Sequence, residues 1–252
     1  MSLLTPGASN AKTAKHAQDL GIESVILHLA PASLSGKNLC PMASPGCAAA
    51  CLNTAGRGGF DATQEARIRK SQYFNENRAG FLEDLVSELK ALVLKASKNG
   101  RKPVARLNGT SDIPWEKFPV IRNGIEYQNV FAAFPDVTFY DYTKVVARLE
   151  RCQDIPNYRL TFSASECNDC HCLRALELGY NVAVVLRDAA ETFAGYPVIS
   201  GDEHDYRFLD PMGGHIVALT PKGKARHDDS GFVRDGWDCF HPERTPRFAT
   251  QA

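Results

Sequence analysis

The sequence predicts a single α/β domain built around a parallel sheet, and two observations favour this class. Short apolar runs alternate along the chain with stretches in which apolar residues recur at helical spacing, and this alternation indicates β/α units. The length of 252 residues suits one domain of the barrel type, or two small ones. Because the runs are fewer than the eight strands of a closed (β/α) barrel, we expect an incomplete parallel (β/α) barrel or an open sheet.

The first half of the chain supplies the elements that flank a cysteine-rich loop. Residues 1–20 are polar and are expected to form an irregular arm that contains Lys12, Lys15 and His16. Residues 24–30 form an apolar run typical of a buried strand. Residues 62–77 predict a basic helix, and residues 81–97 predict an amphipathic helix that stops before an Asn-Gly pair.

The second half continues the alternation of strands and helices. Residues 104–107 and 137–142 predict strands, with helices expected at 115–123 and 145–152. Residues 158–162 alternate in polarity as a strand does, and residues 170–178 predict a helix. The near-continuous apolar run 182–186 is typical of a strand covered on both faces, and residues 216–219 predict a last strand. Residues 221–252 are expected to form a loop-like tail.

Charge and hydropathy disfavour some classes of partner. Lys plus Arg and Asp plus Glu number 29 each, so the chain has no overall field that attracts nucleic acid or an acidic membrane. Nucleic acid is not excluded, because Lys222, Lys224, Arg226 and His227 form a basic run suited to phosphate. No stretch approaches the ~20 apolar residues that span a bilayer, and the N-terminus lacks the apolar core of a secretory signal. We therefore expect a cytoplasmic protein.

Cysteine is the residue type that carries the most chemical information. The chain has eight cysteines, and disulfides are rare in a reducing cytoplasm, so tight clusters of them indicate metal or redox chemistry. Six of the eight fall in two clusters, which are Cys40, Cys47 and Cys51, and then Cys167, Cys170 and Cys172. The second cluster either binds a second metal, completes the first site, or consists of small buried residues at the start of a helix.

The first cluster is predicted to be a loop that folds around a metal. Its sequence is C-P-M-A-S-P-G-C-A-A-A-C, in which Pro41, Pro45 and Gly46 supply turns. Soft thiolate ligands select zinc, copper(I) or iron–sulfur clusters. A structural zinc site needs a fourth ligand, and the loop contains none, whereas a [4Fe–4S] cluster with one exchangeable iron needs three thiolates. A zinc site closed by His28 or by a cysteine of the second cluster is the alternative, although a mid-strand histidine such as His28 is more often a satisfied core residue.

Polar residues follow the expected strands, where ligand sites of parallel sheets lie. The cysteine loop follows the first strand, and the next three strands end in N-G-T-S-D, Y-T-K and S-A-S-E. The candidate site residues in these segments are Asn108, Gly109, Thr110, Ser111, Asp112, Lys144, Ser163, Ser165 and Glu166. Structural alternatives exist for each, since Ser, Asp and Glu also cap helices and Lys144 suits a solvated surface. Asp205 and Arg207 are expected to form a structural ion pair.

A strand followed by a three-cysteine loop in a β/α barrel resembles the radical S-adenosylmethionine (SAM) superfamily. The spacing here, C-x6-C-x3-C, departs from the usual C-x3-C-x2-C, and Ala50 stands where an aromatic residue is usual. A resemblance over nearly the whole chain is to the uncharacterised phage family called gene product eighty-eight. It rests on Leu39-Cys40-Pro41, on residues 47–51, on D-Y-T-K at 141–144, on L-T-F-S at 160–163 and on residues 201–210.

These resemblances imply a function that the residues alone do not. A [4Fe–4S] cluster on the three cysteines would bind SAM, and a reductant protein would supply the electron that cleaves it to a 5′-deoxyadenosyl radical. Residues 108–112 would meet the SAM amino group, Ser163 and Ser165 would contact its ribose or carboxylate, and Lys144 and Glu166 would act in catalysis. The substrate would be a small molecule or nucleotide in the cytoplasm of an infected host cell. The alternatives are a non-catalytic, metal-stapled phage binding protein and a zinc-site hydrolase or transferase.

Overall fold

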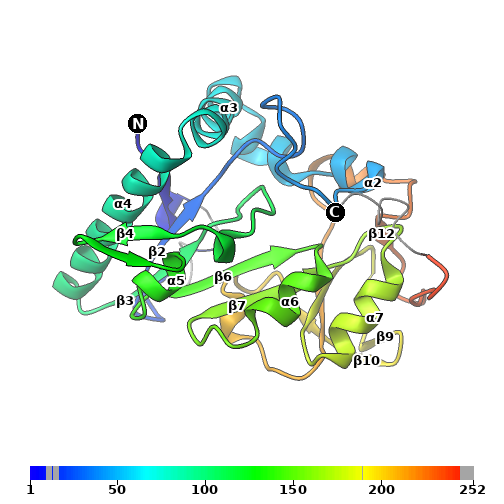
Figure 1. Cartoon of the computed structure of the whole chain (residues 1–252). Coiled ribbons are helices and arrows are strands. Elements are labelled where there is room, and N and C mark those ends of the chain that lie inside the picture. Colours follow the sequence, from blue (N-terminus) through cyan, green and yellow to red (C-terminus); the bar gives the residue numbers. More distant parts are fainter. Residues whose placement is uncertain (10–12, 14–16, 189, 245–252) are drawn as a thin grey trace.

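A computed structural model describes residues 1–9, 13, 17–188 and 190–244 of the chain (Figure 1). It is a mixed α/β structure whose central sheet is mostly parallel. The predicted Lys12, Lys15 and His16 lie outside the described residues.

The central sheet follows the order β1-β2-β3-β6-β7-β8-β11-β10-β9. Its parallel strands are β2 (Ile22–Leu27), β3 (Lys102–Arg106), β6 (Thr138–Thr143), β7 (Tyr158–Ser163), β8 (Val182–Leu186), β11 (Ile216–Leu219) and β10 (Tyr196–Ser200). The short strands β1 (Leu4–Pro6) and β9 (Thr192–Phe193) pair antiparallel at the two ends of the path. All of the strands predicted from apolar runs are therefore present.

Helices lie against one face of this sheet, where they enclose the main core. They are α3 (Asp61–Glu76), α4 (Arg78–Lys98), α5 (Val130–Ala133), α6 (Val146–Cys152) and α7 (Asp169–Glu177). Figure 1 shows α4 alongside β2 and β3, and α6 and α7 beside β7. The apolar face of α4, with Leu85 and Leu89 fully buried, packs in the same cluster as Phe139 and Phe162 of the sheet. Burial of this kind is the main source of helix stability in a protein.

The opposite face of the sheet carries a second, smaller core. Ile22, Val104 and Tyr140 project there from three adjacent strands and pack against Tyr206. The segment 201–210 crosses this face, and Asp205 in it accepts from Arg106 of β3 at 2.9 Å. The expected ion pair between Asp205 and Arg207 is therefore wrong, since Arg207 instead lies 3.3 Å from Asp210.

The predicted helix at 115–123 is also wrong. A single 3-10 turn, η4 (Trp115–Lys117), is followed by a hairpin of β4 (Val120–Arg122) and β5 (Ile125–Tyr127). Pro119 lacks the N–H that a continuing helix needs. Asn123 and Gly124 then both adopt positive φ, at 55° and 77°, which is the geometry that an Asn-Gly pair favours in a two-residue hairpin loop.

The two chain ends are more ordered than the sequence predicts. Within the expected arm at 1–20, Leu3 and Leu4 are buried and β1 pairs with β2. Within the expected tail, β12 (Val233–Arg234) pairs parallel with β8 at Val185 and Leu186. Such strands of two or three residues contain too few side chains to show a periodic pattern.

Candidate metal centre

The cysteine loop leaves β2 and forms a short helix, α2 (Pro45–Ala49), at its centre. Ser44 is the N-cap, and its hydroxyl accepts a hydrogen bond from the backbone N–H of Cys47 at 3.2 Å. Proline at the first helical position is compatible with this start because its missing N–H has no partner there. Cys47 thus lies in the first turn of α2, and Cys51 directly follows the C-cap residue Ala50.

The three thiols of the loop lie close enough to influence one another. Burial raises the pKa of the Cys40 thiol to about 11, and negative charge on Asp112, Cys51 and Cys47 raises it further. Burial also raises the pKa of Cys51, and Cys47 adds to this rise. That these three cysteines hold one metal centre stays a prediction. The three sulfurs are nevertheless not all within 4.8 Å of one another.

Two cations lie beside Cys51 and oppose the rise in its pKa. They are the Arg67 guanidinium of α3 and the Lys144 ammonium, which follows β6. Arg67 is buried and donates to the backbone carbonyl of Asn53 at 3.1 Å. A positive charge beside a thiol stabilises the thiolate form, which is the form that binds metals.

Glu166 fixes the cysteine loop from a distant part of the chain. One carboxylate oxygen accepts from the Ser44 hydroxyl and the other from the backbone N–H of Gly46, both at 2.6 Å. A Cβ at Gly46 would lie 2.8 Å from this carboxylate and 2.2 Å from the Ser230 hydroxyl. The S-P-G-C segment is thus a docking element, in which glycine permits the close approach. Glu166 was predicted as a catalytic residue, and the structure places it as a positioning residue for α2.

The N-G-T-S-D segment is organised by Asn108. Its side-chain oxygen accepts from the Ser111 hydroxyl at 3.0 Å, from the Ile113 N–H at 2.9 Å and from the Trp115 indole at 3.2 Å. Its backbone N–H donates to Asp141 at 2.6 Å. The predicted binding side chains of Asn108 and Ser111 are therefore engaged within their own loop.

The other residues of the N-G-T-S-D segment contact both the cysteine loop and the residues that follow β6. The Asp112 carboxylate accepts hydrogen bonds from the backbone N–H of Lys144 at 2.8 Å and from the Arg148 guanidinium at 2.6 Å. The backbone carbonyl of Thr110 lies 3.7 Å from Cys40 Sγ, and a Cβ at Gly109 would lie 2.6 Å from His28. The segment therefore faces the cysteines with its backbone.

Lys144 and Ser163, which were predicted in different roles, lie in direct contact. The Lys144 ammonium donates to the Ser163 hydroxyl at 2.6 Å and lies 5.7 Å from the centre of the Phe232 ring. Ser165 is buried two residues further along the chain, where its backbone N–H donates to the Asn168 side-chain oxygen at 2.7 Å. Among the predicted polar side chains, Lys144 and Ser163 are therefore the pair best suited to bind a ligand.

The second cysteine cluster lies at the start of α7. Cys172 is fully buried in the main core, and its sulfur lies 3.5 Å from the Asn168 side-chain oxygen. Cys167 is half-buried, and burial raises the pKa of its thiol. In the part of the chain that the structure describes, these cysteines form no group of three metal-ligating atoms within 4.8 Å.

His28 differs from the satisfied core histidine that was expected. Its Nδ1 atom is buried and has no hydrogen-bond partner. Burial lowers its pKa to about 3, and the charges of Arg67, Arg106 and Lys70 lower it further. The imidazole is therefore neutral at physiological pH.

Sequence reasoning missed the buried polar network beneath the site. Arg148 is fully buried, with Asp112 on one side and Glu116 at 3.0 Å on the other. Asp141 is fully buried as well, and burial raises its pKa to about 7. The signal available in the sequence was a single aspartate inside an otherwise apolar and aromatic strand, since a buried charge is rarely without a partner.

The C-terminal segment also packs on the cysteine loop. Ala50 forms a small apolar cluster with Ala225 and Val233, and a Cβ at Gly223 would lie 3.1 Å from the Ala55 side chain. The segment expected to be a loop-like tail therefore covers part of the candidate centre.

A family model described as Gene product 88 matches residues 2–236. The chain belongs to this phage gene-product family. The match includes the three cysteines of the loop, Lys144, Ser163 and Glu166, and it ends before the last part of the C-terminal segment. No curated protein and no solved structure matches the chain. Among the described residues, no helix is both long enough and apolar enough to cross a membrane.

Proposed function

We propose that Cys40, Cys47 and Cys51 hold a [4Fe–4S] cluster and that the protein is an enzyme of the radical SAM type. The observation that carries the proposal is the approach of three thiols to one another beside two cations. Negative charge on the Cys47 thiol raises the pKa of Cys40 and Cys51. The positive charges of Arg67 and Lys144 oppose the rise in the pKa of Cys51. Such cations would offset part of the negative charge that thiolate ligands bring to a cluster.

The donor set fits a cluster better than a single zinc ion. Zinc–sulfur bonds of about 2.3 Å place tetrahedral sulfur ligands less than ~4 Å apart, and the three sulfurs are not all within 4.8 Å. Three soft thiolates with no fourth protein ligand suit an iron–sulfur cluster with one accessible iron. Because burial raises the thiol pKa of Cys40 and Cys51, binding must release protons from them.

The winding of the sheet supports the barrel-like part of the proposal. Strands β2, β3, β6, β7, β8 and β11 are neighbours in the same order as they occur in the chain, whereas a doubly wound sheet reverses its order at a switch point. Helices cover the face that holds the main core. We infer an incomplete (β/α) barrel with the centre at the carboxyl ends of its strands, where such folds place their sites.

The residues that would meet SAM are fewer than the sequence suggests. A [4Fe–4S] cluster with one iron free of protein ligands supplies, when bound, a coordination site for SAM and the electron for its cleavage. Because the side chains of Asn108, Ser111 and Asp112 are engaged, their segment offers only the backbone of Gly109 and Thr110. Lys144 presents a cation for an anionic group of SAM or substrate, and Ser163 holds that cation in place.

The test is SAM cleavage by protein reconstituted anaerobically with iron and sulfide. We expect wild type, with a chemical reductant or a reductant protein, to form 5′-deoxyadenosine, and Cys47→Ser to form none because it cannot hold the cluster. Cys170→Ser is the matched control and should retain the activity. A protein that assembles the cluster but forms no 5′-deoxyadenosine would contradict the catalytic half and favour a non-catalytic, metal-stapled protein.

A further inference from the structure

The C-terminal segment contains a cluster of potential ligands that is separate from the cysteine loop. Asp238, Cys239 and His241 each offer one ligand atom, and these atoms all lie within 4.8 Å of one another. The sulfur of Cys239 lies 3.8 Å from His241 Nε2, and that nitrogen lies 3.5 Å from Asp238 Oδ1. We propose that these three side chains bind one zinc ion.

The spacing of the ligand atoms is close to what zinc requires. Bonds of about 2.3 Å to sulfur and 2.0–2.2 Å to nitrogen and oxygen place tetrahedral ligands roughly 3.4–3.6 Å apart. The two observed separations exceed these values by only a few tenths of an ångström. A mixed set of sulfur, nitrogen and oxygen suits zinc, which accepts all three.

The side chains around these ligands orient them as the surroundings of metal sites do. The second ring nitrogen of His241, Nδ1, lies 3.4 Å from Glu243 Oε1, and a ligating histidine usually donates its other N–H to a carboxylate or carbonyl. This pairing leaves Nε2 free to bind metal. The other oxygen of Asp238 lies 3.1 Å from Arg234. Oδ1 faces His241 and also accepts a hydrogen bond from the backbone N–H of Cys239 at 2.8 Å.

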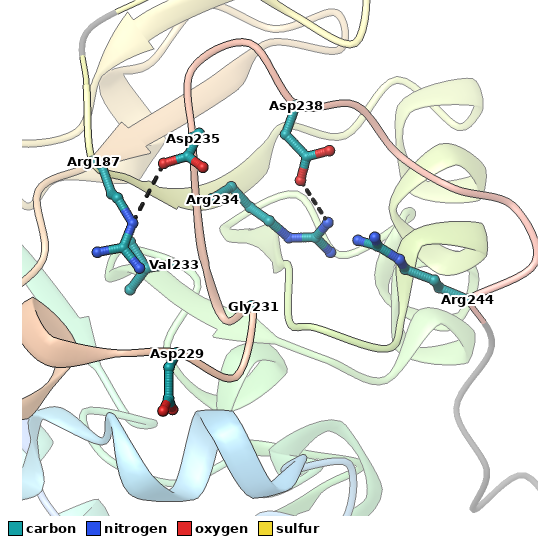
Figure 2. Close-up of a pocket in the computed structure, with 8 residues that line it drawn as sticks. All are labelled: Arg187, Asp229, Gly231, Val233, Arg234, Asp235, Asp238 and Arg244. Carbon is teal, nitrogen blue, oxygen red and sulfur yellow. Dashed lines mark hydrogen bonds and ion pairs between the residues drawn. The ribbon is translucent and has the colours of Figure 1, made fainter.

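The backbone that carries the ligands is anchored to α7 and to the sheet. Arg234 is 2% exposed, and it donates to the carbonyl of Ser165 at 3.0 Å and to Asp169 at 2.5 Å. The backbone N–H of His241 donates to the other oxygen of Asp169 at 2.9 Å. Figure 2 shows Asp238 joined to Arg234 at the wall of a pocket that Arg187 and Arg244 also line. Fixed anchors on both sides of the ligands reduce the ordering cost of binding a metal.

The site is open on one side. Cys239 is exposed and His241 is half-buried, so a fourth position is accessible to water. The ligands follow the last residue of the family match at 236, and the zinc site shares none of its three ligands with the proposed cluster on Cys40, Cys47 and Cys51.

The experiment is a zinc titration of the metal-free full-length chain against a chromophoric chelator. Wild type should bind one more equivalent of zinc per chain than Cys239→Ser, and His241→Gln should show the same loss. Any zinc held by the cysteine loop is common to all of these proteins and cancels in the difference. Cys170→Ser is the matched control and should bind as wild type does.

Two further measurements keep the test independent of folding and of adventitious binding. Cobalt(II) in wild type should give a stronger sulfur-to-metal charge-transfer band than in Cys239→Ser, and the difference should correspond to one site per chain while the circular dichroism spectra are the same. Glu243→Gln should weaken zinc binding about 10-fold or more, because it removes the partner of the ligating histidine. Equal zinc stoichiometry in wild type and in folded Cys239→Ser would overturn the proposal.

Discussion

At the scale of single residues, the centre depends on polar groups that already have partners inside the protein. Glu166 reaches across 120 positions of sequence to accept from Gly46 N–H, and Asp112 accepts from both Lys144 and Arg148. The side chains of Glu166 and Asp112 were predicted to contact cofactor or substrate. Residue type and position at a strand end identified them as part of one site, but their hydrogen bonds depend on contacts between segments far apart in the sequence, which the local pattern does not contain.

His28 gives the clearest pH effect of a single residue. Its folded-state pKa of about 3 lies below the ordinary value of 6.5, so between these values the unfolded chain binds a proton that the folded chain does not. The free energy of unfolding should therefore fall as pH decreases through this window, by about 1.4 kcal/mol per pH unit from this group.

Replacing His28 by glutamine should remove this contribution. Urea denaturation of wild type and His28→Gln between pH 6.5 and 5 should show that wild type loses about 2 kcal/mol more than the variant over this range. Parallel pH profiles for the two proteins would show that His28 is not buried in its neutral form.

At the scale of elements, the sequence predicts best where a side-chain pattern runs through several residues. The amphipathic helix α4 and the apolar strand β8 follow from such patterns and are present. The hairpin of β4 and β5 has strands of three residues, and its Asn-Gly turn was the signal that could have identified it. The short helix α2 was not predicted either, because its stability comes from docking on Glu166 rather than from a helical pattern.

The docking of α2 makes an unusual prediction for Gly46. In an exposed helix, replacing glycine by alanine stabilises by about 1 kcal/mol. Here the new Cβ would lie 2.2 Å from Ser230 Oγ and 2.8 Å from the Glu166 carboxylate, so Gly46→Ala should destabilise by about 1–3 kcal/mol and lower the metal content of the protein.

Chemical denaturation and metal analysis measure both effects of this change. The double variant Gly46→Ala/Ser230→Ala removes one of the two clashes and should recover part of the loss. A single variant at least as stable as wild type would show that α2 does not depend on this close approach.

At the scale of the whole molecule, two segments that are distant in the sequence meet at the cysteine loop. The loop before α7 supplies Glu166, and the C-terminal segment packs on Ala50 and is fixed by Arg234. The order of the parallel strands could be expected from the alternation of strands and helices. The cover that the C-terminal segment provides could not, because its few apolar residues show no periodicity and its main anchor is a buried ion pair between Arg234 and Asp169.

That ion pair can be compared with an exposed one on the same carboxylate. Asp169 is fully buried and pairs with Arg234, which is 2% exposed at its side chain, and with Arg244, which is 41% exposed and 3.6 Å away. Arg234→Met leaves a buried charge without its main partner and should cost about 3–5 kcal/mol. Arg244→Met should change stability by less than about 1 kcal/mol. Equal losses in urea denaturation would contradict the role of Arg234 as the anchor of this segment.

The proposed function depends on an iron–sulfur cluster held by Cys40, Cys47 and Cys51. The most direct measurement is the iron, sulfide and zinc content of the protein after anaerobic reconstitution, with its visible absorption spectrum. We expect a brown protein with about four irons per chain, and almost no iron in the variant with all three cysteines replaced by serine. A colourless wild-type protein that takes up no iron and holds zinc on these three cysteines would contradict it.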